Sequence, residues 1–251
     1  MTTLLETRQL YKQFGGLTVT DRCDFSVDAG EIHALIGPNG AGKTTMIAQI
    51  AGSLRPDAGR IFFNGKDITR LSMARRVHLG LARTYQITNI FKTYSVLDNL
   101  ALSVQSRTGS SFQFWRPMRS EQALFDQAAE IADRIGLGDR KDMLAGELSH
   151  GQQRQLEVGL ALAINAQMLL LDEPMAGMGM DESGRMIELI RKLNEDVTVL
   201  LVEHDMDAVF QLADRISVLV YGQIIATGTP ESIRTNEEVQ MAYLGEEMPD
   251  A

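Results

Sequence analysis

Short, continuous apolar runs alternate along this chain with segments whose apolar residues recur every three or four positions. The runs Ile32–Ile36, Met168–Leu171 and Val197–Val202 have the length and composition of buried strands. Helical spacing is found over Thr44–Ile50, Glu182–Leu193 and Met206–Ala213. Strands that alternate with helices in this way predict a mostly parallel sheet that is covered by helices on both faces.

Two further patterns lie outside this alternation. Antiparallel strands, with turns at Asp28–Gly30 and Asn64–Gly65, are predicted over Leu4–Gln9, Thr18–Val27 and Arg60–Asn64. Helices are predicted over Val96–Val104, Glu121–Ile135 and His150–Ile164. We therefore expect an α/β fold in which residues 1–86 and 166–251 form a core that includes an antiparallel β subdomain. Residues 87–165 would form an inserted α-helical subdomain within a single domain, 1–251.

The segment Ser106–Pro117, between the first two of these helices, is rich in serine and glycine but carries three aromatic residues. Phe112, Phe114 and Trp115 form an apolar group in a polar loop, which is typical of a contact surface. The same rings could equally fold back onto the neighbouring helices, and the sequence leaves both interpretations open.

Composition narrows the class of protein. With 251 residues, 44% of them apolar, and six prolines, the chain is typical of a globular domain. The best candidate for a membrane span, Val158–Leu171, is interrupted by Asn165 and Gln167 and is shorter than the ~18 residues required. Residues 1–6 lack the basic flank and apolar core of a secretion signal, and Cys23 is the only cysteine. These features predict a soluble protein of the reducing cytoplasm.

The charge of the chain argues against nucleic acid as a partner. The formal net charge is −9, from 33 acidic and 24 basic residues, so the chain as a whole repels a polyanion. Two small basic clusters, Arg75–Arg76 and Arg116 with Arg119, are interpreted as solvated helix faces or as contacts with a partner protein. We therefore predict no nucleic-acid partner.

The segment Gly37–Thr44 reads Gly-Pro-Asn-Gly-Ala-Gly-Lys-Thr and lies between a predicted strand and a predicted helix. This pattern is typical of a phosphate-binding loop, because its glycines let successive N–H groups converge on phosphate oxygens. Lys43 would neutralise the β- and γ-phosphates, the Thr44 hydroxyl would bind Mg²⁺, and Thr45 would reach the α-phosphate. The predicted nucleotide-binding residues of this loop are Gly37, Pro38, Asn39, Gly40, Ala41, Gly42, Lys43, Thr44 and Thr45.

Three polar residues directly follow predicted buried strands. Asp172 ends the run Met168–Leu171, at the edge where α/β sheets bind ligands, and we expect it to hold Mg²⁺. Glu173 is placed to polarise a water toward the γ-phosphate, and two adjacent ionised carboxylates need a partner such as Mg²⁺. His204 follows the run Thr198–Glu203 and would face the same phosphates.

Gln86 lies where the core gives way to the helical segment. Its amide could bind Mg²⁺ or the attacking water, so that it would report the γ-phosphate to the helical subdomain. His33 and His78 have no comparable context, and we interpret both as structural.

A second anion-binding element is predicted at Leu148–Gln153, with Ser149 23 residues before Asp172. Ser149 suits a helix N-cap and Leu148 a hydrophobic staple, and capping alone would explain the serine. Capping does not explain Gly151 in the first turn, where glycine costs ~1 kcal/mol relative to alanine, whereas close approach of a phosphate would. Because the chain already has one phosphate loop, we expect the nucleotide bound here to belong to another subunit. The binding residues would be Ser149, Gly151 and Gln152.

With these elements in this order, nearly the whole chain resembles the ATP-binding subunits of ATP-binding-cassette (ABC) transporters. Gly37–Thr44 is similar to the Walker A motif, Met168–Asp172 to Walker B and Ser149–Gln153 to the signature motif. Gln86 is similar to the Q-loop glutamine, His204 to the switch histidine and Phe14 to the A-loop aromatic that stacks on adenine. The resemblance implies a P-loop NTPase fold and an ATPase that uses ATP and Mg²⁺. It assigns catalysis to Lys43, Gln86, Glu173 and His204, and the metal to Thr44, Gln86 and Asp172.

The resemblance also implies partners. A second ABC subunit, identical or paralogous, would form a head-to-tail dimer in which each ATP lies between one subunit's Walker motifs and the other's signature motif. Transmembrane permease subunits would bind the dimer and place it at the cytoplasmic face of the inner membrane. A periplasmic or extracellular solute-binding protein would act through the permease.

Softer features are similar to the branched-chain (hydrophobic) amino acid uptake subfamily and its urea-transporter relatives. They are Phe14–Gly16, the long segment Ser106–Pro117, Glu173–Met178, and the ending Ala242–Glu246 that lipopolysaccharide-export ATPases share. The implied function is an ATP-hydrolysing motor that imports branched-chain or other hydrophobic amino acids or a related small solute. An export ATPase is one alternative, and a soluble ABC protein that acts on DNA or ribosomes is another.

Two positions depart from the family pattern. His150 replaces the glycine commonest at that place in the signature, although the urea-type branch tolerates histidine there. Gly179 takes the place of the D-loop aspartate of many relatives, and Asp181 follows two residues later. Both departures fall on the surface that would face the second subunit.

Overall fold

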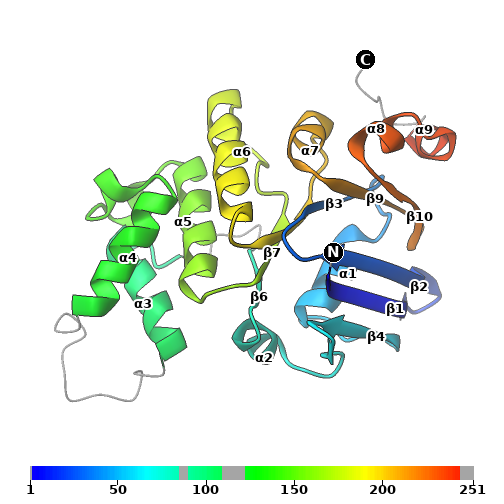
Figure 1. Ribbon diagram of the computed structural model, residues 1–251, viewed down its shortest axis with the longest axis horizontal. Coiled ribbons are helices and arrows are strands. Elements are labelled where there is room, and N and C mark those ends of the chain that lie inside the picture. Colours follow the sequence, from blue (N-terminus) through cyan, green and yellow to red (C-terminus); the bar gives the residue numbers. More distant parts are fainter. Residues whose placement is uncertain (1, 85–89, 109–121, 244–251) are drawn as a thin grey trace.

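Two β-sheets lie toward one end of the molecule and a group of helices, α3, α4 and α5, lies toward the other (Figure 1). The structure is a computed structural model that describes residues 2–84, 90–108 and 122–243. The predicted α/β fold, with a mostly parallel sheet, an antiparallel β region and a helical middle, is confirmed.

The larger sheet is built on three strands in which every residue is buried: β3 (Ile32–Ile36), β7 (Met168–Asp172) and β8 (Thr198–Val202). Its strand order is β10-β9-β3-β8-β7-β6, with outer strands β6 (Leu81–Arg83), β9 (Arg215–Val220) and β10 (Gln223–Gly228). All neighbouring strands are parallel except β9 and β10. The parallel arrangement therefore brings the carboxyl ends of β3, β7 and β8 to one edge, where ligands bind in such sheets.

The smaller sheet is antiparallel and has the order β2-β1-β4-β5. Its strands are β1 (Thr3–Phe14), β2 (Leu17–Asp28), β4 (Ala58–Phe63) and β5 (Lys66–Asp67). Helix α1 (Lys43–Ala51) lies between the two sheets, because Met46 and Ile50 share one buried cluster with Leu5 of β1 and Leu200 of β8. Burial of such side chains stabilises the fold by ~1.5–3 kcal/mol each, which fixes the start of α1 relative to both sheets.

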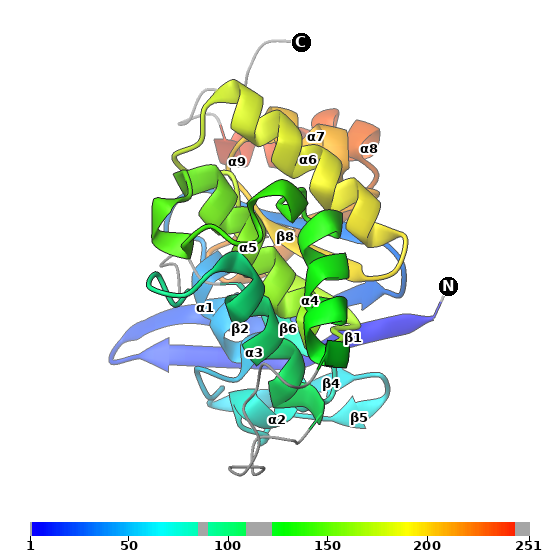
Figure 2. The ribbon, with the colours of Figure 1, turned by 90° about the vertical axis from the view of Figure 1, so that its left-hand side faces the viewer.

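The opposite face of the larger sheet is covered by helices from the middle and the second half of the chain. Leu171 and Leu201 point to this side and pack with Leu100, Leu156 and Ile190. Figure 2 shows α3, α4 and α5 in front of the sheet when the molecule is seen from their end. Besides α1, the helices of the described residues, on either side of the sheet, are α2 (Met73–His78), α3 (Val96–Thr108), α4 (Gln122–Arg134), α5 (His150–Ala163), α6 (Met180–Asn194), α7 (Met206–Leu212), α8 (Pro230–Arg234) and α9 (Glu237–Tyr243). Short 3₁₀ turns lie at Gly138–Arg140 and Ala145–Glu147.

Two predicted boundaries were wrong. Strand β1 continues beyond Gln9 to Phe14, because a bulge interrupts the pattern there: Gln9 has φ 49° and donates its N–H to Asp24 at 2.6 Å. Helix α3 includes Ser106–Thr108, which we expected in a loop. The aromatic group Phe112, Phe114 and Trp115 lies outside the described residues. Strands β6, β9 and β10 and helices α2, α8 and α9 were not predicted.

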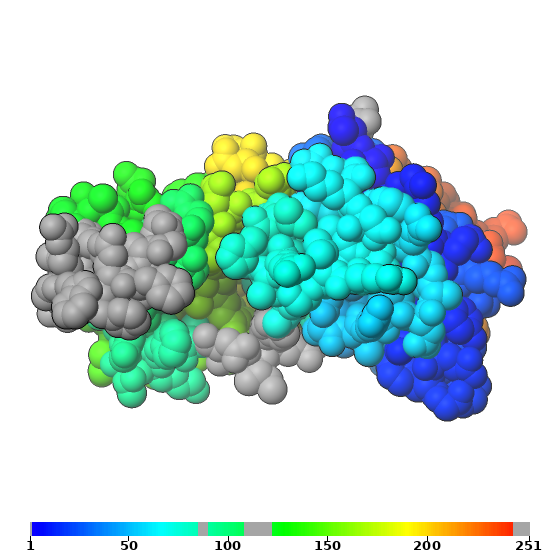
Figure 3. Space-filling view, turned by 90° about the horizontal axis from the view of Figure 1, so that it is seen from below, coloured from blue at the N-terminus to red at the C-terminus, as the bar shows by residue number. Residues whose placement is uncertain are grey.

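Arg76 corrects the interpretation of the Arg75–Arg76 pair as a solvated helix face. Its side chain is buried, and the guanidinium donates to the carbonyl oxygens of Gln49 at 2.7 Å and Ile50 at 2.6 Å, at the end of α1. It also donates to Leu71 and Thr69 at 3.1 Å each. Burial lowers the pKa of Arg76 to about 10, so it is still protonated at neutral pH. Arg76 therefore caps α1. The segment 51–80, which contains α2, forms the middle of the face seen in Figure 3 (cyan).

Replacement of Arg76 by alanine is expected to lower the free energy of unfolding by about 3–5 kcal/mol. The change removes a hydrogen-bond donor from four carbonyl groups and opens a cavity. Denaturant titration of Arg76→Ala beside Arg75→Ala measures this, because Arg75 is exposed and its loss should shift stability by only about 0.5 kcal/mol. Equal stability of the two variants would show that Arg76 does not hold α1.

Cys23 is buried in the cluster between the two sheets. Burial raises the pKa of its thiol to about 12, so the reactive thiolate is scarce at neutral pH.

Across the described residues, no helix has both the length and the apolar character that crossing a bilayer requires.

Candidate functional site

The loop between β3 and α1 forms the first wall of the site. Gly42 is the residue before the first residue of α1 and has φ 105°, and a side chain there would collide with the carbonyl oxygen of Val19. Only glycine therefore lets the loop turn into the helix this close to β2. The Lys43 ammonium donates to the carbonyl oxygens of Gly37 at 2.5 Å and Pro38 at 3.1 Å, so it lies within the loop where a phosphate group would bind.

Asp172, the last residue of β7, has its two carboxylate oxygens in different environments. Oδ2 accepts a hydrogen bond from Arg83 of β6 at 2.8 Å, and both side chains are largely buried. Oδ1 is buried and accepts no hydrogen bond from the described residues. Arg83 therefore supplies one positive partner for this carboxylate, for which the sequence suggested only Mg²⁺.

The residues present nevertheless fit Mg²⁺. A buried carboxylate oxygen without a hydrogen bond is costly unless a ligand satisfies it, and Oδ1 of Asp172 is such an oxygen. The Thr44 hydroxyl is exposed at the start of α1, as a ligand of a bound cation requires. Gln86, the third predicted ligand, lies outside the described residues.

Glu173 follows Asp172 in an unusual backbone conformation. Its φ is 50°, in the left-handed region that residues other than glycine seldom adopt, and its N–H donates to Val202 at 2.8 Å. Such strain persists only where the surroundings enforce it, and it concentrates at functional sites. The bend carries the Glu173 side chain away from the strand, so that Glu173 Oε1 lies 4.0 Å from Nδ1 of His204 after β8.

One cavity joins these elements. It has a volume of about 410 Å³ and is lined by Gly37, Asn39, Lys43, Glu173, Glu203, His204 and Met206. The structure thus brings the phosphate loop together with Glu173 and His204, as the sequence predicted, and leaves their chemical roles as predictions. The cavity combines the cationic Lys43 with the acidic Glu173 and Glu203, and its volume lies in the range of small-molecule binding sites.

Glu203 is a site residue that the sequence reasoning missed. In the sequence it stands at the end of an apolar run, and an acidic residue at the end of a buried strand is itself a signal of a functional site. Its side chain is only 1% exposed. Burial raises the pKa of the Glu203 carboxyl above its ordinary value, and the N–H groups of Met175, His204 and Asp205 oppose that rise.

The signature turn lies apart from this cavity, at the start of α5. Ser149 is the N-cap: its Oγ accepts from the Gln152 N–H at 3.3 Å, and the Gln152 side chain accepts from the Ser149 N–H at 3.1 Å. The predicted N-cap is confirmed, and the capping box leaves the serine exposed on the surface.

Glu182, at the start of α6, gives Gly151 a reason that the sequence did not show. A methyl group at Gly151 would lie 2.8 Å from the Glu182 carboxyl carbon, and Glu182 accepts a hydrogen bond from Ser149 Oγ at 2.9 Å. A larger residue at position 151 would have to displace the end of the Glu182 side chain, so the glycine favours the contact between Glu182 and Ser149. At Gly179 the space around Cα is open and φ is −78°, so none of the described residues requires glycine there.

The last predicted nucleotide contacts are only partly placed. Phe14 ends β1, is half exposed, and has the Lys12 ammonium 5.3 Å from its ring centre. A half-exposed ring is available for stacking, and its role toward adenine stays a prediction.

Comparison with known proteins decides the family. The profile of the family described as "ABC transporter" matches residues 20–176. The chain belongs to the ABC transporter family. A second profile, described as "Branched-chain amino acid ATP-binding cassette transporter", matches residues 223–248 of this ABC protein. The chain contains an ABC ATPase domain.

Relatives of known description match over nearly their whole length. The high-affinity branched-chain amino acid transport ATP-binding proteins BraF of Pseudomonas aeruginosa and LivG of Escherichia coli are each 36% identical over 250 residues, with 97% of this chain and 98% of each relative covered. Among solved structures, the ADP conformation of MJ1267, an ATP-binding cassette of an ABC transporter, has a TM-score of 0.86 and 33% identity. That match covers 98% of this chain and 100% of MJ1267.

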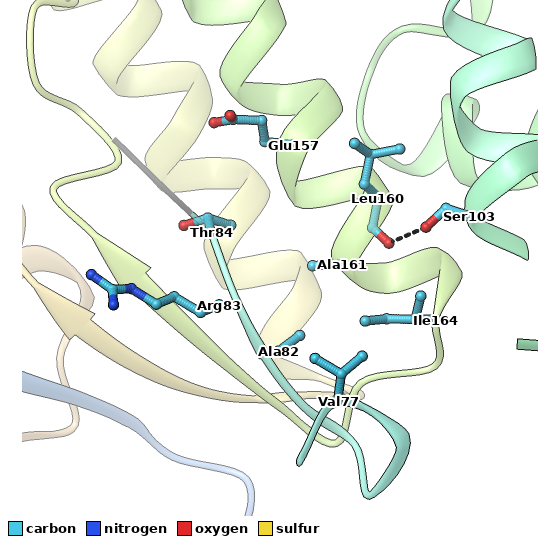
Figure 4. A pocket seen from close by; sticks show the side chains of 9 residues that line it. All are labelled: Val77, Ala82, Arg83, Thr84, Ser103, Glu157, Leu160, Ala161 and Ile164. Atoms are coloured by element: carbon cyan, nitrogen blue, oxygen red, sulfur yellow. Dashed lines mark hydrogen bonds between the residues drawn. The ribbon is translucent and has the colours of Figure 1, made fainter. Parts of the chain in front are cut away.

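A second pocket lies where the larger sheet meets the helices α3 and α5 (Figure 4). Its volume is about 240 Å³, and its lining is mostly apolar: Val77, Ala82, Arg83, Thr84, Ser103, Glu157, Leu160, Ala161 and Ile164. Ser103 donates to the carbonyl oxygen of Leu160 at 2.9 Å, which joins α3 to α5 along one wall. A change in the angle between the sheet and these helices would alter the width of the pocket.

Proposed function

We propose that this chain is the ATP-hydrolysing subunit of a membrane transporter that imports branched-chain or other hydrophobic amino acids, or a related small solute. The convergence of Lys43, Glu173 and His204 on one cavity supports the hydrolytic activity. The names of BraF and LivG, together with the match over residues 223–248, support the solute class.

Hydrolysis would proceed by attack of water on the γ-phosphate. The Glu173 carboxylate would orient that water and draw on its proton, while Lys43 and His204 would offset the charge that develops on the transferring group. Mg²⁺, held by Thr44, Asp172 and Gln86, would supply further positive charge at the β- and γ-phosphate oxygens. Phe14 would stack on the adenine.

A single subunit would hold only half of each site. The signature turn lies away from the cavity of its own subunit, and its exposed Ser149 and helix start suit the γ-phosphate of an ATP that a second ABC subunit binds. We propose a head-to-tail dimer with an identical or paralogous cassette. Residues 87–165 would act as an inserted subdomain that moves when the dimer closes.

The remaining partners follow from transport. Permease subunits in the membrane would receive the movement of the helical subdomain. The apolar pocket between β6 and α5 is a suitable contact for one of their segments, because it lies where the larger sheet meets the helices that would move. The cassette would then sit at the cytoplasmic face of the inner membrane. A solute-binding protein outside the membrane would deliver the amino acid.

The test is purification of the complex from detergent-solubilised membranes, followed by identification of its subunits and by ATPase assays in proteoliposomes. We expect permease subunits to co-purify, and the solute-loaded binding protein to stimulate ATP hydrolysis and to drive leucine uptake. Export of a lipid, or recovery of the chain only with ribosomes, would favour the alternatives and reject this function.

Glu182 should weaken the binding of ATP across the dimer. Its carboxylate accepts the hydrogen bond of the Ser149 hydroxyl and would repel a γ-phosphate. Glu182→Gln should therefore lower the ATP concentration for half-maximal hydrolysis by about two- to fivefold, the size of effect expected for a charge near the surface. Asp181→Asn is the matched control, because it removes an equal charge one residue away and leaves the contact with Ser149 in place. An equal effect of the two variants would assign the change to overall charge.

A further inference from the structure

Glu203 connects the two loops that carry the candidate catalytic groups. Its Oε1 accepts from the N–H of Met175 at 3.0 Å, in the loop after β7. Its Oε2 accepts from the N–H of His204 at 3.0 Å and is 3.5 Å from that of Asp205, after β8. One buried side chain therefore holds the backbone on both sides of the cavity.

Glu203 directly follows the last residue at which β7 and β8 are paired. Asp172 pairs with Val202 across β7 and β8, and the N–H of Glu173 donates to the carbonyl of Val202. One step further, the Met175 N–H is met by the Glu203 carboxylate. Glu203 thus extends the connection between the loops past the strained backbone of Glu173.

The carboxylate also lies beside the imidazole of His204. Oε2 of Glu203 is 3.7 Å from Nδ1 of His204, whereas Oε1 of Glu173 is 4.0 Å from the same atom. The two neighbours differ in burial, since Glu203 is buried and held by backbone N–H groups, whereas Glu173 is partly exposed. Because 3.7 Å is longer than a hydrogen bond, Glu203 positions His204 through the backbone N–H that it accepts, and its fixed charge lies beside one ring nitrogen.

We propose that Glu203 is a positioning residue for ATP hydrolysis, which orients His204 and holds it at a fixed spacing from the Glu173 loop. This inference rests on the proposed function. Glu203 does not reach the γ-phosphate in this scheme; it acts through His204. Its removal should therefore impair the chemical step and leave nucleotide binding by the Lys43 loop intact.

The test variant is Glu203→Gln, which keeps the shape of the side chain but replaces one acceptor oxygen by a donor. We expect kcat for ATP hydrolysis to fall on the order of a hundredfold, as for a small displacement of a catalytic group, with KM for ATP unchanged. In a His204→Ala background the same substitution should have little further effect, because the two residues act as one unit.

The chain offers a matched control at the opposite edge of the same sheet. Glu31 is also a buried glutamate, accepts from the Asp28 N–H at 2.8 Å, and lies 2.9 Å from Nδ1 of His33. Glu31→Gln should cost comparable stability in thermal unfolding but leave kcat unchanged. This comparison separates a loss of fold from a loss of positioning.

Nuclear magnetic resonance of the imidazole nitrogens gives a readout that needs no turnover. The chain has four histidines, so the His204 signals can be assigned by difference from His204→Ala. Glu203→Gln should shift the His204 signals and leave those of His33, and Glu31→Gln should do the reverse. If the amide prevents folding, Glu203→Asp keeps the charge on a shorter side chain and should show the same changes in smaller degree.

Several results would overturn the positioning role. They are a kcat of Glu203→Gln equal to wild type, a full loss that persists in the His204→Ala background, and unmoved His204 signals. Absence of ATP hydrolysis in the wild-type complex would instead reject the proposed function, and the imidazole signals would still report on Glu203.

Discussion

Glu173→Gln is expected to lower the rate of ATP hydrolysis by about 10²–10⁴-fold while the subunit still binds ATP, as for the loss of a general base. The glutamine cannot draw a proton from the attacking water. Phosphate release measures the first part of the prediction, and binding of a fluorescent ATP analogue measures the second. Since the loop and Lys43 are untouched, the affinity for ATP should be that of wild type.

The strained backbone at Glu173 makes the choice of glutamine important. Glutamine has the same shape and the same cost at φ 50°, so stability should change little. Glu188→Gln on the exposed face of α6 is the control for the loss of one negative charge. Wild-type turnover in Glu173→Gln would remove Glu173 from the catalytic role and would direct attention to His204.

The sequence predicted those parts of the fold and site that depend on local pattern. The apolar runs of β3, β7 and β8 mark buried parallel strands because both faces of such strands are covered. The phosphate loop has a pattern that spans few residues, and Glu173 and His204 follow strands directly, so parallel topology alone brings them to one edge.

The rest depends on contacts between distant residues. Arg83 reaches Asp172 because β6 pairs with β7. The register of this pair of strands cannot be predicted from the sequence of either strand. Arg76 is buried because it meets the end of α1, although its neighbours in sequence are those of a surface residue. Gly151 faces Glu182 only because α5 and α6 start side by side.

The link between Glu203 and Met175 belongs to the same class. The sequence shows an acid before His204, and only the fold shows that its other oxygen reaches the loop after β7. The positions of Glu173 and His204 at one edge of the sheet could therefore be predicted from strand ends, whereas the contacts that hold them in place could not.

In a dimer of identical chains, the head-to-tail arrangement predicts that Ser149→Asp will lower ATP hydrolysis by at least about a hundredfold, whereas Ser149→Asn will have a small effect. Aspartate and asparagine cap a helix about equally well, so both keep an N-cap for α5. An aspartate also repels Glu182, so thermal unfolding of both variants must show equal stability for the comparison to hold. They differ in charge, and only the aspartate repels the partner's γ-phosphate.

Mixing of variants then tests which subunit supplies the signature. In a dimer of identical chains, Lys43→Ala and Ser149→Asp should each be inactive alone, because each destroys both sites. A mixture would form heterodimers with one intact site, and roughly a quarter of wild-type activity should return, as the two-fold symmetry requires. With a paralogous partner no activity returns on mixing. In that complex Lys43→Ala disables the site of its own phosphate loop and Ser149→Asp disables the site of the partner's phosphate loop, so the double variant disables both. If Ser149 instead served its own subunit's ATP, the double variant would be no worse than either single variant in that complex, and the composite site would be wrong.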